Sequence, residues 1–127
     1  MIELTKAEEQ VMQFLWKLEK AFLKDIVENY SEPKPASTTV ATVIRVLIKK
    51  GFIGFNTYGK INEYFPLISK DDYFRKHFKK VAKNFFNGSS SKIASFFTDD
   101  KDVNLSELEE MKQMIEERIK KLKENNE

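Results

Sequence analysis

Apolar residues recur at helical spacing in the first part of the chain and predict two helices there. After Thr5 the apolar positions fall three or four residues apart, which places them on one face of a helix. Thr5 and Glu8 have the spacing of a capping box, so this helix should begin at Thr5. A shorter pattern over residues 23–30 predicts a second helix, which the proline-containing segment 31–35 ends.

Residues 37–50 carry an apolar stripe at helical spacing and predict a third helix. Their many β-branched side chains would favour a strand by local propensity alone. Gly51 supplies a C-cap, however, and lysines precede it at the negative end of the helix dipole, so we expect a helix. The next two segments, 52–57 and 61–65, are short and aromatic-rich and flank Gly59, which predicts a two-stranded hairpin.

Two longer amphipathic helices are expected beyond the hairpin. One opens at Ser69 and ends at the polar segment 87–91, and a short apolar piece at 93–97 follows it. Ser106 has the spacing of a capping box with Glu109 and should start the last helix. Stripes of this kind typically face a partner, so we expect dimerisation through them. Their members are Phe74, Phe78, Val81, Phe85, Leu108, Met111, Ile115, Ile119 and Leu122.

The order of elements predicts a mostly α fold with a small β-hairpin. Three helices followed by a hairpin are the elements of a winged helix-turn-helix, which we assign to residues 1–70 as a DNA-binding domain. Residues 71–127 form the expected α-helical dimerisation domain. Charge changes along this second part, since residues 71–92 carry 6 basic and 2 acidic side chains whereas residues 93–127 carry 6 basic and 10 acidic ones. A polyanion should therefore meet the earlier part of the chain.

Composition narrows the chemistry that the chain can perform. It has no cysteine and a single histidine, His77, which excludes disulfides and thiolate sites and argues against a catalytic triad or a zinc centre. We therefore expect no enzyme activity, cofactor or metal. With 41% hydrophobic and 33% charged residues and no long apolar run, we expect a cytoplasmic protein without membrane insertion.

The third helix has the residue types of a DNA-reading element on its outer side. Short hydroxyl side chains allow close approach to base edges, a methyl group can touch thymine, and arginine can bind guanine with two hydrogen bonds. Lysines at the end of this helix and at the hairpin tip would contact phosphates. The residues expected to contact DNA are Ser37, Thr38, Thr39, Ala41, Thr42, Arg45, Lys49, Lys50, Tyr58 and Lys60.

Three strings of residues, 4–16, 37–47 and 49–53, resemble the penicillinase-repressor family, the BlaI/MecI/CopY group. The resemblance implies a repressor that dimerises through its C-terminal helices and binds a two-fold operator in double-stranded DNA. In members that respond to β-lactams, a membrane-bound sensor protease triggers cleavage in the C-terminal domain, and the corresponding bond here is Ser95–Phe96. Serine replaces the asparagine of the cleaved members, so the alternative is a small helix that packs into the dimer core.

The chain departs from the family at other positions, and further readings stay open. Thr38 and Ala41 stand where the family usually has basic residues, which implies fewer charged contacts with DNA. The Cys-x-Cys motifs of copper-responsive members are missing. One alternative is a protein-interaction module that uses the third helix or the hairpin aromatics Phe55 and Tyr58. Another is a repressor that responds to a small molecule bound in an aromatic pocket.

Overall fold

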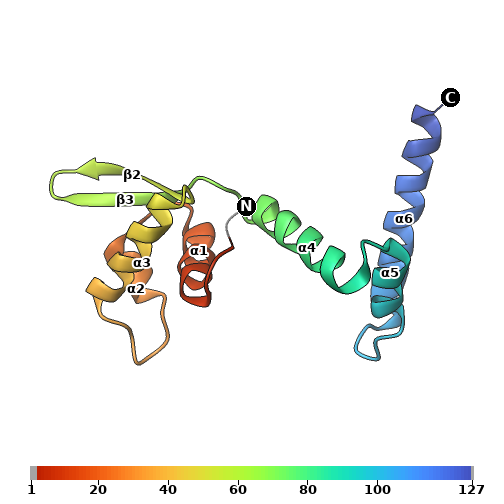
Figure 1. Ribbon diagram of the computed structural model, residues 1–127, viewed down its shortest axis with the longest axis horizontal. Coiled ribbons are helices and arrows are strands. Elements are labelled where there is room, and N and C mark those ends of the chain that lie inside the picture. Colours follow the sequence, from red (N-terminus) through yellow and green to blue (C-terminus); the bar gives the residue numbers. More distant parts are fainter. Residues whose placement is uncertain (1–2, 127) are drawn as a thin grey trace. The chain divides into compact units, whose positions relative to one another are not determined.

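The computed structural model describes residues 3–126 as six helices and three strands (Figure 1). Contacts divide the chain into two units, Met1–Phe78 and Lys79–Glu127. The helices are α1 (Lys6–Leu18), α2 (Leu23–Glu28), α3 (Ser37–Lys49), α4 (Lys70–Phe86), α5 (Ser90–Thr98) and α6 (Leu105–Asn125), and the strands are β1 (Ala21–Phe22), β2 (Ile53–Tyr58) and β3 (Ile61–Pro66).

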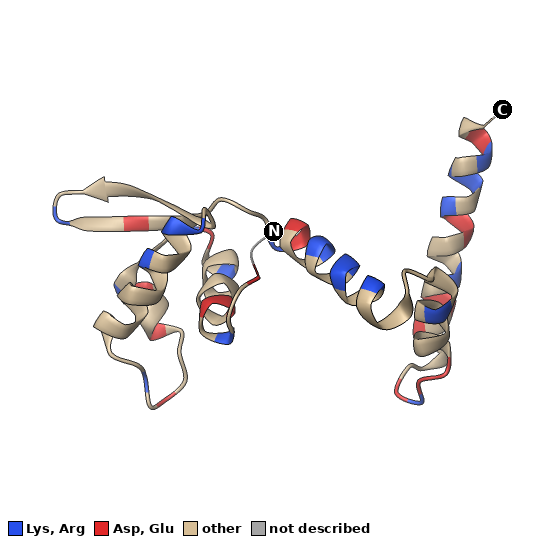
Figure 2. Ribbon diagram, viewed as in Figure 1, with Lys and Arg blue, Asp and Glu red and all other residues tan. Residues whose placement is uncertain are grey.

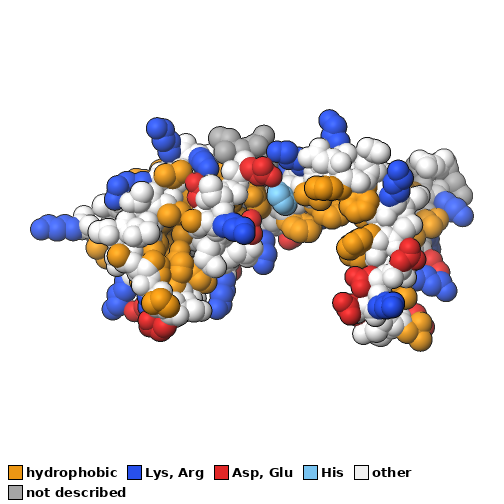
Figure 3. All heavy atoms as spheres, turned by 60° about the horizontal axis from the view of Figure 1, so that its bottom comes forward, with side chains coloured by type: hydrophobic (Ala, Val, Ile, Leu, Met, Phe, Trp, Pro, Cys, Tyr) orange, Lys and Arg blue, Asp and Glu red, His pale blue; other side chains and the backbone are white. Residues whose placement is uncertain are grey.

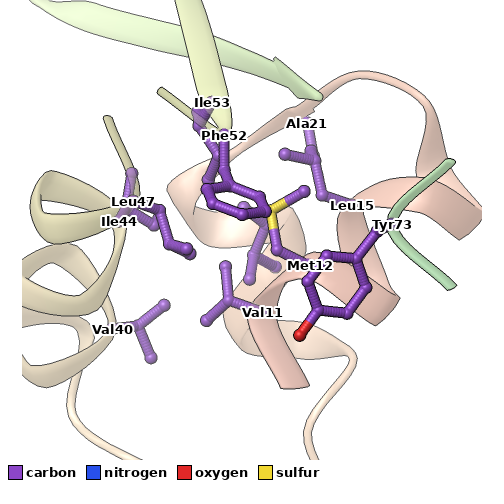
Figure 4. Packing of buried hydrophobic residues seen from close by; sticks show 11 residues of the cluster. Val11, Met12, Leu15, Ala21, Val40, Ile44, Leu47, Phe52, Ile53 and Tyr73 are labelled. Atoms are coloured by element: carbon purple, nitrogen blue, oxygen red, sulfur yellow. The ribbon is translucent and has the colours of Figure 1, made fainter. Parts of the chain in front are cut away.

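The core of the first unit lies where α1, α2, α3 and the start of the sheet meet (Figure 4). The predicted stripes supply it, because the buried residues of each helix recur at helical spacing. Phe52 and Ile53, where β2 begins, and Tyr73 in the first turn of α4 also belong to this core. The largest buried side chains are Val11, Met12, Leu15, Ile26, Val40, Ile44, Leu47, Phe52 and Ile53.

The boundary between the two units falls inside α4, later than the expected division at residue 70. Tyr73 explains the displacement, because its ring is buried and lies 5.8 Å from both the Trp16 and the Phe52 ring centroids. The first turns of α4 therefore belong to the first unit. The order of three helices and a hairpin is that of a winged helix-turn-helix, which confirms the predicted fold class.

The hairpin is part of a three-stranded antiparallel sheet with the order β1-β3-β2. In β3, Tyr64 pairs with Phe55 of β2 on one side and with Ala21 of β1 on the other. The short strand β1 was not predicted, because two residues show no alternation. It follows a tight turn at Glu19, where φ is 68° and the Lys20 amide donates to the Leu18 carbonyl oxygen at 2.8 Å.

Helix starts agree with the sequence in the first unit and differ in the second. Thr5 and Glu8 form the expected reciprocal capping box. The capping box predicted at Ser106 is wrong, since Asn104 and Glu107 form it instead. Both pairs have the required spacing, and the earlier one gives α6 additional hydrogen-bonded residues.

The second unit contains the end of α4 followed by α5 and α6. Helix α4 ends where Asn87 and Gly88 adopt positive φ, and the Gly88 amide donates to the Ala82 carbonyl oxygen at 3.0 Å. Ser89 then caps α5, so this helix begins within the segment expected to be a break. None of the helices described between residues 3 and 126 is long and apolar enough to cross a membrane.

Candidate nucleic-acid interface

Helix α3 has one buried side and one polar exposed side. Val40, Ile44 and Leu47 face α1 and are almost fully buried, which fixes the rotation of the helix about its axis. The opposite side is consequently solvent-facing, and Figure 2 marks the basic positions of α3 in blue on the ribbon. Of the residues predicted to contact DNA, Ala41 is half-buried, and the exposed ones on α3 are Ser37, Thr38, Thr39, Thr42, Arg45 and Lys49.

The hydroxyl group of Thr42 is already used within α3. Its Oγ1 donates to the carbonyl oxygen of Thr38 at 2.9 Å, one helical turn earlier. The group therefore offers a bound base an oxygen acceptor and a methyl group, but no hydrogen-bond donor. Such a surface suits a thymine methyl or a base amino group.

Lys50, which was predicted to contact phosphate, forms an ion pair within the protein. Its Nζ lies 2.6 Å from Oε1 of Glu8, and its side chain is only 22% exposed. The Lys50 ammonium is thus paired with a nearly buried carboxylate, whereas the neighbouring Lys49 is exposed. The pairing could not be seen in the sequence because Glu8 lies 42 positions earlier.

The hairpin of β2 and β3 forms the wing. Tyr58 is 55% exposed near its tip, and Lys60 is exposed at the turn, where Gly59 has a φ of 62°. Strand β1 packs against the wing, since the Phe22 and Tyr58 rings meet edge-to-face with their centroids 6.4 Å apart. Tyr58 and Lys60 therefore stand on a supported and exposed hairpin.

A hollow of about 610 Å³ lies between α2, the start of α3 and the wing. It brings together Ser37 and Lys60, which the sequence placed at separate ends of the DNA surface. Lys24 and Asn62 line the same hollow and were not predicted as site residues. No sequence pattern indicates that Lys24 lies here, because the start of α2 approaches the wing through the pairing of the two-residue strand β1 with β3.

The residues predicted to mediate dimerisation are partly uncovered in the single chain. Figure 3 shows hydrophobic side chains along α4 beside His77. Phe85 is 78% exposed and Ile115 is 58% exposed, and a largely apolar groove of about 630 Å³ separates α5 from α6. Of the nine residues, Phe78, Val81, Leu108 and Met111 are half-buried, and Phe74, Phe85, Ile115, Ile119 and Leu122 are exposed.

The residues of the expected cleavage region lie within α5. Ser95 Oγ donates to the carbonyl oxygen of Ser91 at 3.0 Å, and Phe96 is 60% exposed with its ring against Phe86 and Phe97. Both residues thus have helical backbone. Among residues 3–126 no group of three acidic or histidine side chains is arranged to hold a metal ion.

Comparison with known proteins assigns the chain to a family. The family model described as penicillinase repressor matches residues 4–117. The methicillin resistance regulatory protein MecI of Staphylococcus aureus (strain N315) is 29% identical over 114 residues, covering 89% of this chain and 93% of the relative. The penicillinase repressor of Bacillus licheniformis is 26% identical over 123 residues, covering 96% of each chain.

Solved structures give shorter matches, which cover a little more than half of the chain. The DNA-binding domain of the repressor BlaI is 28% identical with a TM-score of 0.49, covering 56% of this chain and 88% of that one. The Bacillus licheniformis BlaI monomeric form in complex with the blaP half-operator is 27% identical with a TM-score of 0.48, covering 57% and 89%. The family match spans nearly the whole sequence, and the chain therefore belongs to the penicillinase repressor family, as its sequence motifs predicted.

Proposed function

We propose that this protein is a homodimeric, DNA-binding transcriptional repressor that places α3 in the major groove of each half of a two-fold operator. The observation that carries the proposal is the division of α3 into a fully buried apolar side and an exposed side of hydroxyl, methyl and cationic groups. Family membership supports it, since the relatives are named as a penicillinase repressor and a regulator of methicillin resistance.

Base recognition would come from the middle of α3. Arg45 is exposed and can donate two hydrogen bonds to the O6 and N7 atoms of a guanine. Thr42 adds a methyl group and an acceptor one turn earlier, and Ala41 leaves space for a thymine methyl. The exposed hydroxyls of Ser37 and Thr39 stand nearer the start of the helix.

Phosphate contacts would come from both ends of the same surface. Lys49 is exposed at the last turn of α3, and Lys60 is exposed at the wing tip. Lys24 joins Lys60 around the hollow and adds a cation there. Such contacts fix the position of the protein along DNA without reading its sequence.

Dimerisation would bring two copies of α3 to successive half-sites, about 34 Å apart. The exposed apolar side chains on α6 and the groove beside α5 support this step, because burial of apolar surface drives association. Binding of one half-site then raises the effective concentration of the second reading helix at the other half-site. Few cations lie on α3, so this linkage would supply much of the affinity.

The test starts from a random-sequence duplex library, from which the full-length protein selects its preferred site. We expect an inverted repeat, bound more tightly than micromolar at physiological salt. Arg45→Ala should weaken binding to the selected duplex by about 1–3 kcal/mol, because one base pair in each half-site loses its contact. Lys120→Ala removes an exposed positive charge from α6 outside the apolar stripe and should leave affinity unchanged. Selection of no common sequence, or equal effects of the two variants, would contradict the proposal.

Relief of repression by cleavage at Ser95–Phe96 is a separate part of the proposal. The exposure of Phe96 on α5 supports access, but the helical backbone there must unwind to enter a protease as an extended strand. The alternative is that α5 stays folded in the dimer core. Mass spectrometry of the protein from β-lactam-treated host cells separates the two, since cleavage gives fragments ending at Ser95 and beginning at Phe96.

A further inference from the structure

A charged pair ties the end of the reading helix α3 to the start of α1. The Nζ atom of Lys50 lies 2.6 Å from Oε1 of Glu8, and the two side chains are only 22% and 9% exposed. Glu8 is also the one charged residue among the buried residues of the described part of the chain. A pair with so little exposure is held in a definite geometry, unlike most ion pairs on a protein surface.

The Glu8 carboxylate is also hydrogen-bonded within the first turn of α1, independently of Lys50. Its Oε1 accepts from the backbone amide of Thr5 at 3.0 Å, and Thr5 Oγ1 accepts in return from the Glu8 amide at 3.2 Å. Burial acts to raise the pKa of Glu8, but hydrogen bonds from Lys50 and from the Thr5 backbone outweigh it and lower the pKa. The carboxylate is therefore charged at neutral pH and is hydrogen-bonded to both Thr5 and Lys50.

Lys50 occupies the junction between the reading helix and the wing. It is the C-cap of α3, and its amide donates to the carbonyl oxygen of Val46 at 2.9 Å. Gly51 follows with a φ of 85°. The Phe52 amide, just before β2, then donates a hydrogen bond of 2.9 Å to the Leu47 carbonyl oxygen. A shift of Lys50 would consequently move both DNA-contacting elements.

The charged pair adds to an apolar contact between α1 and α3 that already sets the rotation of α3. The α1–α3 contact consists of aliphatic side chains such as Val11, Ile44 and Leu47, whose attraction depends on buried area rather than on direction. The Glu8–Lys50 pair adds a directional constraint at one end of α3. The pair therefore adds a specific contact between the end of α3 and the start of α1.

We propose that Glu8 and Lys50 are positioning residues for DNA recognition, which hold α3 and the wing at the spacing that operator binding requires without touching DNA. The inference rests on the proposed DNA-binding function. In this role Lys50 supports α3 without touching DNA, whereas its neighbour Lys49 would contact phosphate directly. Two adjacent lysines thus differ in how the effect of their replacement should depend on salt.

The experiment compares Lys50→Met with Lys49→Met in full-length protein, using the selected duplex and a random duplex of equal length. Affinities are measured over a series of salt concentrations, and urea unfolding gives the folded fraction of each variant. Lys50→Met should bind the selected duplex about tenfold more weakly, with an unchanged salt slope and a lower ratio of selected to random affinity. Lys49→Met should weaken both duplexes equally and reduce the slope by about 0.9 for each phosphate that the protein no longer neutralises.

Glu8→Gln provides a second variant, which should remain folded. Glutamine keeps the acceptor for the Thr5 amide but removes the charge that attracts Lys50, so the capping box is retained. It should reproduce the effect of Lys50→Met, and the double variant should be no worse than either single one.

Three outcomes would overturn the positioning role. A salt slope for Lys50→Met that falls as it does for Lys49→Met would make Lys50 a phosphate contact. Wild-type affinity of the folded Lys50→Met or Glu8→Gln protein would make the pair purely structural, and additive losses in the double variant would show independent roles. Failure of the wild-type protein to select any duplex would instead refute the proposed function itself, so the two failures are distinguishable.

Discussion

The indole nitrogen of Trp16 donates a hydrogen bond of 2.8 Å to the backbone carbonyl oxygen of Ile68, which joins the first helix to the segment before α4. Its ring also lies 5.8 Å from that of Tyr73. Trp16 thus contributes one specific polar contact in addition to apolar packing at the edge of the core. It connects parts of the chain that lie 52 positions apart.

Replacement of Trp16 by Phe should destabilise the first unit, because the Ile68 carbonyl loses its donor while most of the packing remains. We expect the free energy of unfolding to fall by about 1–3 kcal/mol, measured by urea unfolding followed by circular dichroism. Tyr73→Phe is a suitable control, since its hydroxyl only accepts a long 3.4 Å bond from the Leu4 amide. Equal losses in the two variants would show that the indole bond contributes little.

Ile115→Asp should convert the proposed dimer into a monomer, because a carboxylate in the buried interface would lose its hydration. Sedimentation equilibrium should show a single chain, and operator affinity should fall by about 10²-fold or more as linkage between half-sites is lost. Lys120→Asp introduces the same side chain on α6 outside the apolar stripe and should leave both measurements unchanged. Undiminished operator binding by a monomeric Ile115→Asp protein would contradict the bivalent mode.

Thr42 should contribute a methyl contact rather than a donated hydrogen bond, because its hydroxyl proton is directed to the Thr38 carbonyl. Substitution of uracil for single thymines in the operator should weaken wild-type binding at one position of each half-site. Thr42→Ser lacks the methyl group and should be indifferent to that substitution, whereas Thr42→Val should retain the effect. Equal sensitivity of the serine variant would exclude this contact.

The stability of the protein should decline in acid partly through Glu8. Its pKa is lowered in the folded state, so the stabilisation is present above the ordinary value of 4.5 and is lost as the pH falls through the folded-state pKa. Glu8→Gln cannot titrate, and its urea midpoint should fall less between pH 7 and pH 3 than that of the wild type. Glu9→Gln alters an exposed neighbour and should keep the wild-type dependence.

Glu19 should become more favourable as glycine, because its φ of 68° lies in a region that side chains disfavour. We expect Glu19→Gly to raise the free energy of unfolding by about 0.5–1 kcal/mol after the greater entropy of the unfolded chain is included. Glu9→Gly places the same change inside α1 and should lower stability by about 1 kcal/mol. A loss in both variants would contradict backbone strain at Glu19.

Much of the first unit could be predicted because its helices carry periodic apolar stripes with recognisable ends. The spacing around Ile44 was decisive, since it outweighed the strand propensity of the β-branched residues in α3. Strand β1 was missed because two residues have no pattern, and its pairing with β3 depends on a turn at Glu19 that local sequence does not reveal. In the second unit, two overlapping capping pairs made the start of α6 ambiguous.

Some residues of the candidate site could be predicted from the sequence and others could not. The exposed side of α3 follows from helical geometry once the buried stripe is known, so Thr42 and Arg45 were correctly expected to be exposed. The pairing of Lys50 with Glu8 could not be predicted because the two residues are distant in sequence, and side chains that are adjacent in a sequence can differ in burial. The contribution of Lys24 to the hollow depends on the unpredicted strand β1.

The apolar side chains that α6 exposes have a consequence for gene control. Under the proposed dimerisation, a chain that is mostly monomeric at low concentration forms operator-binding dimers in proportion to the square of its abundance. Halving the amount of protein would then reduce the dimer about fourfold by mass action. Promoter activity would respond more steeply to synthesis and dilution of this protein than to those of a repressor that binds as a single chain.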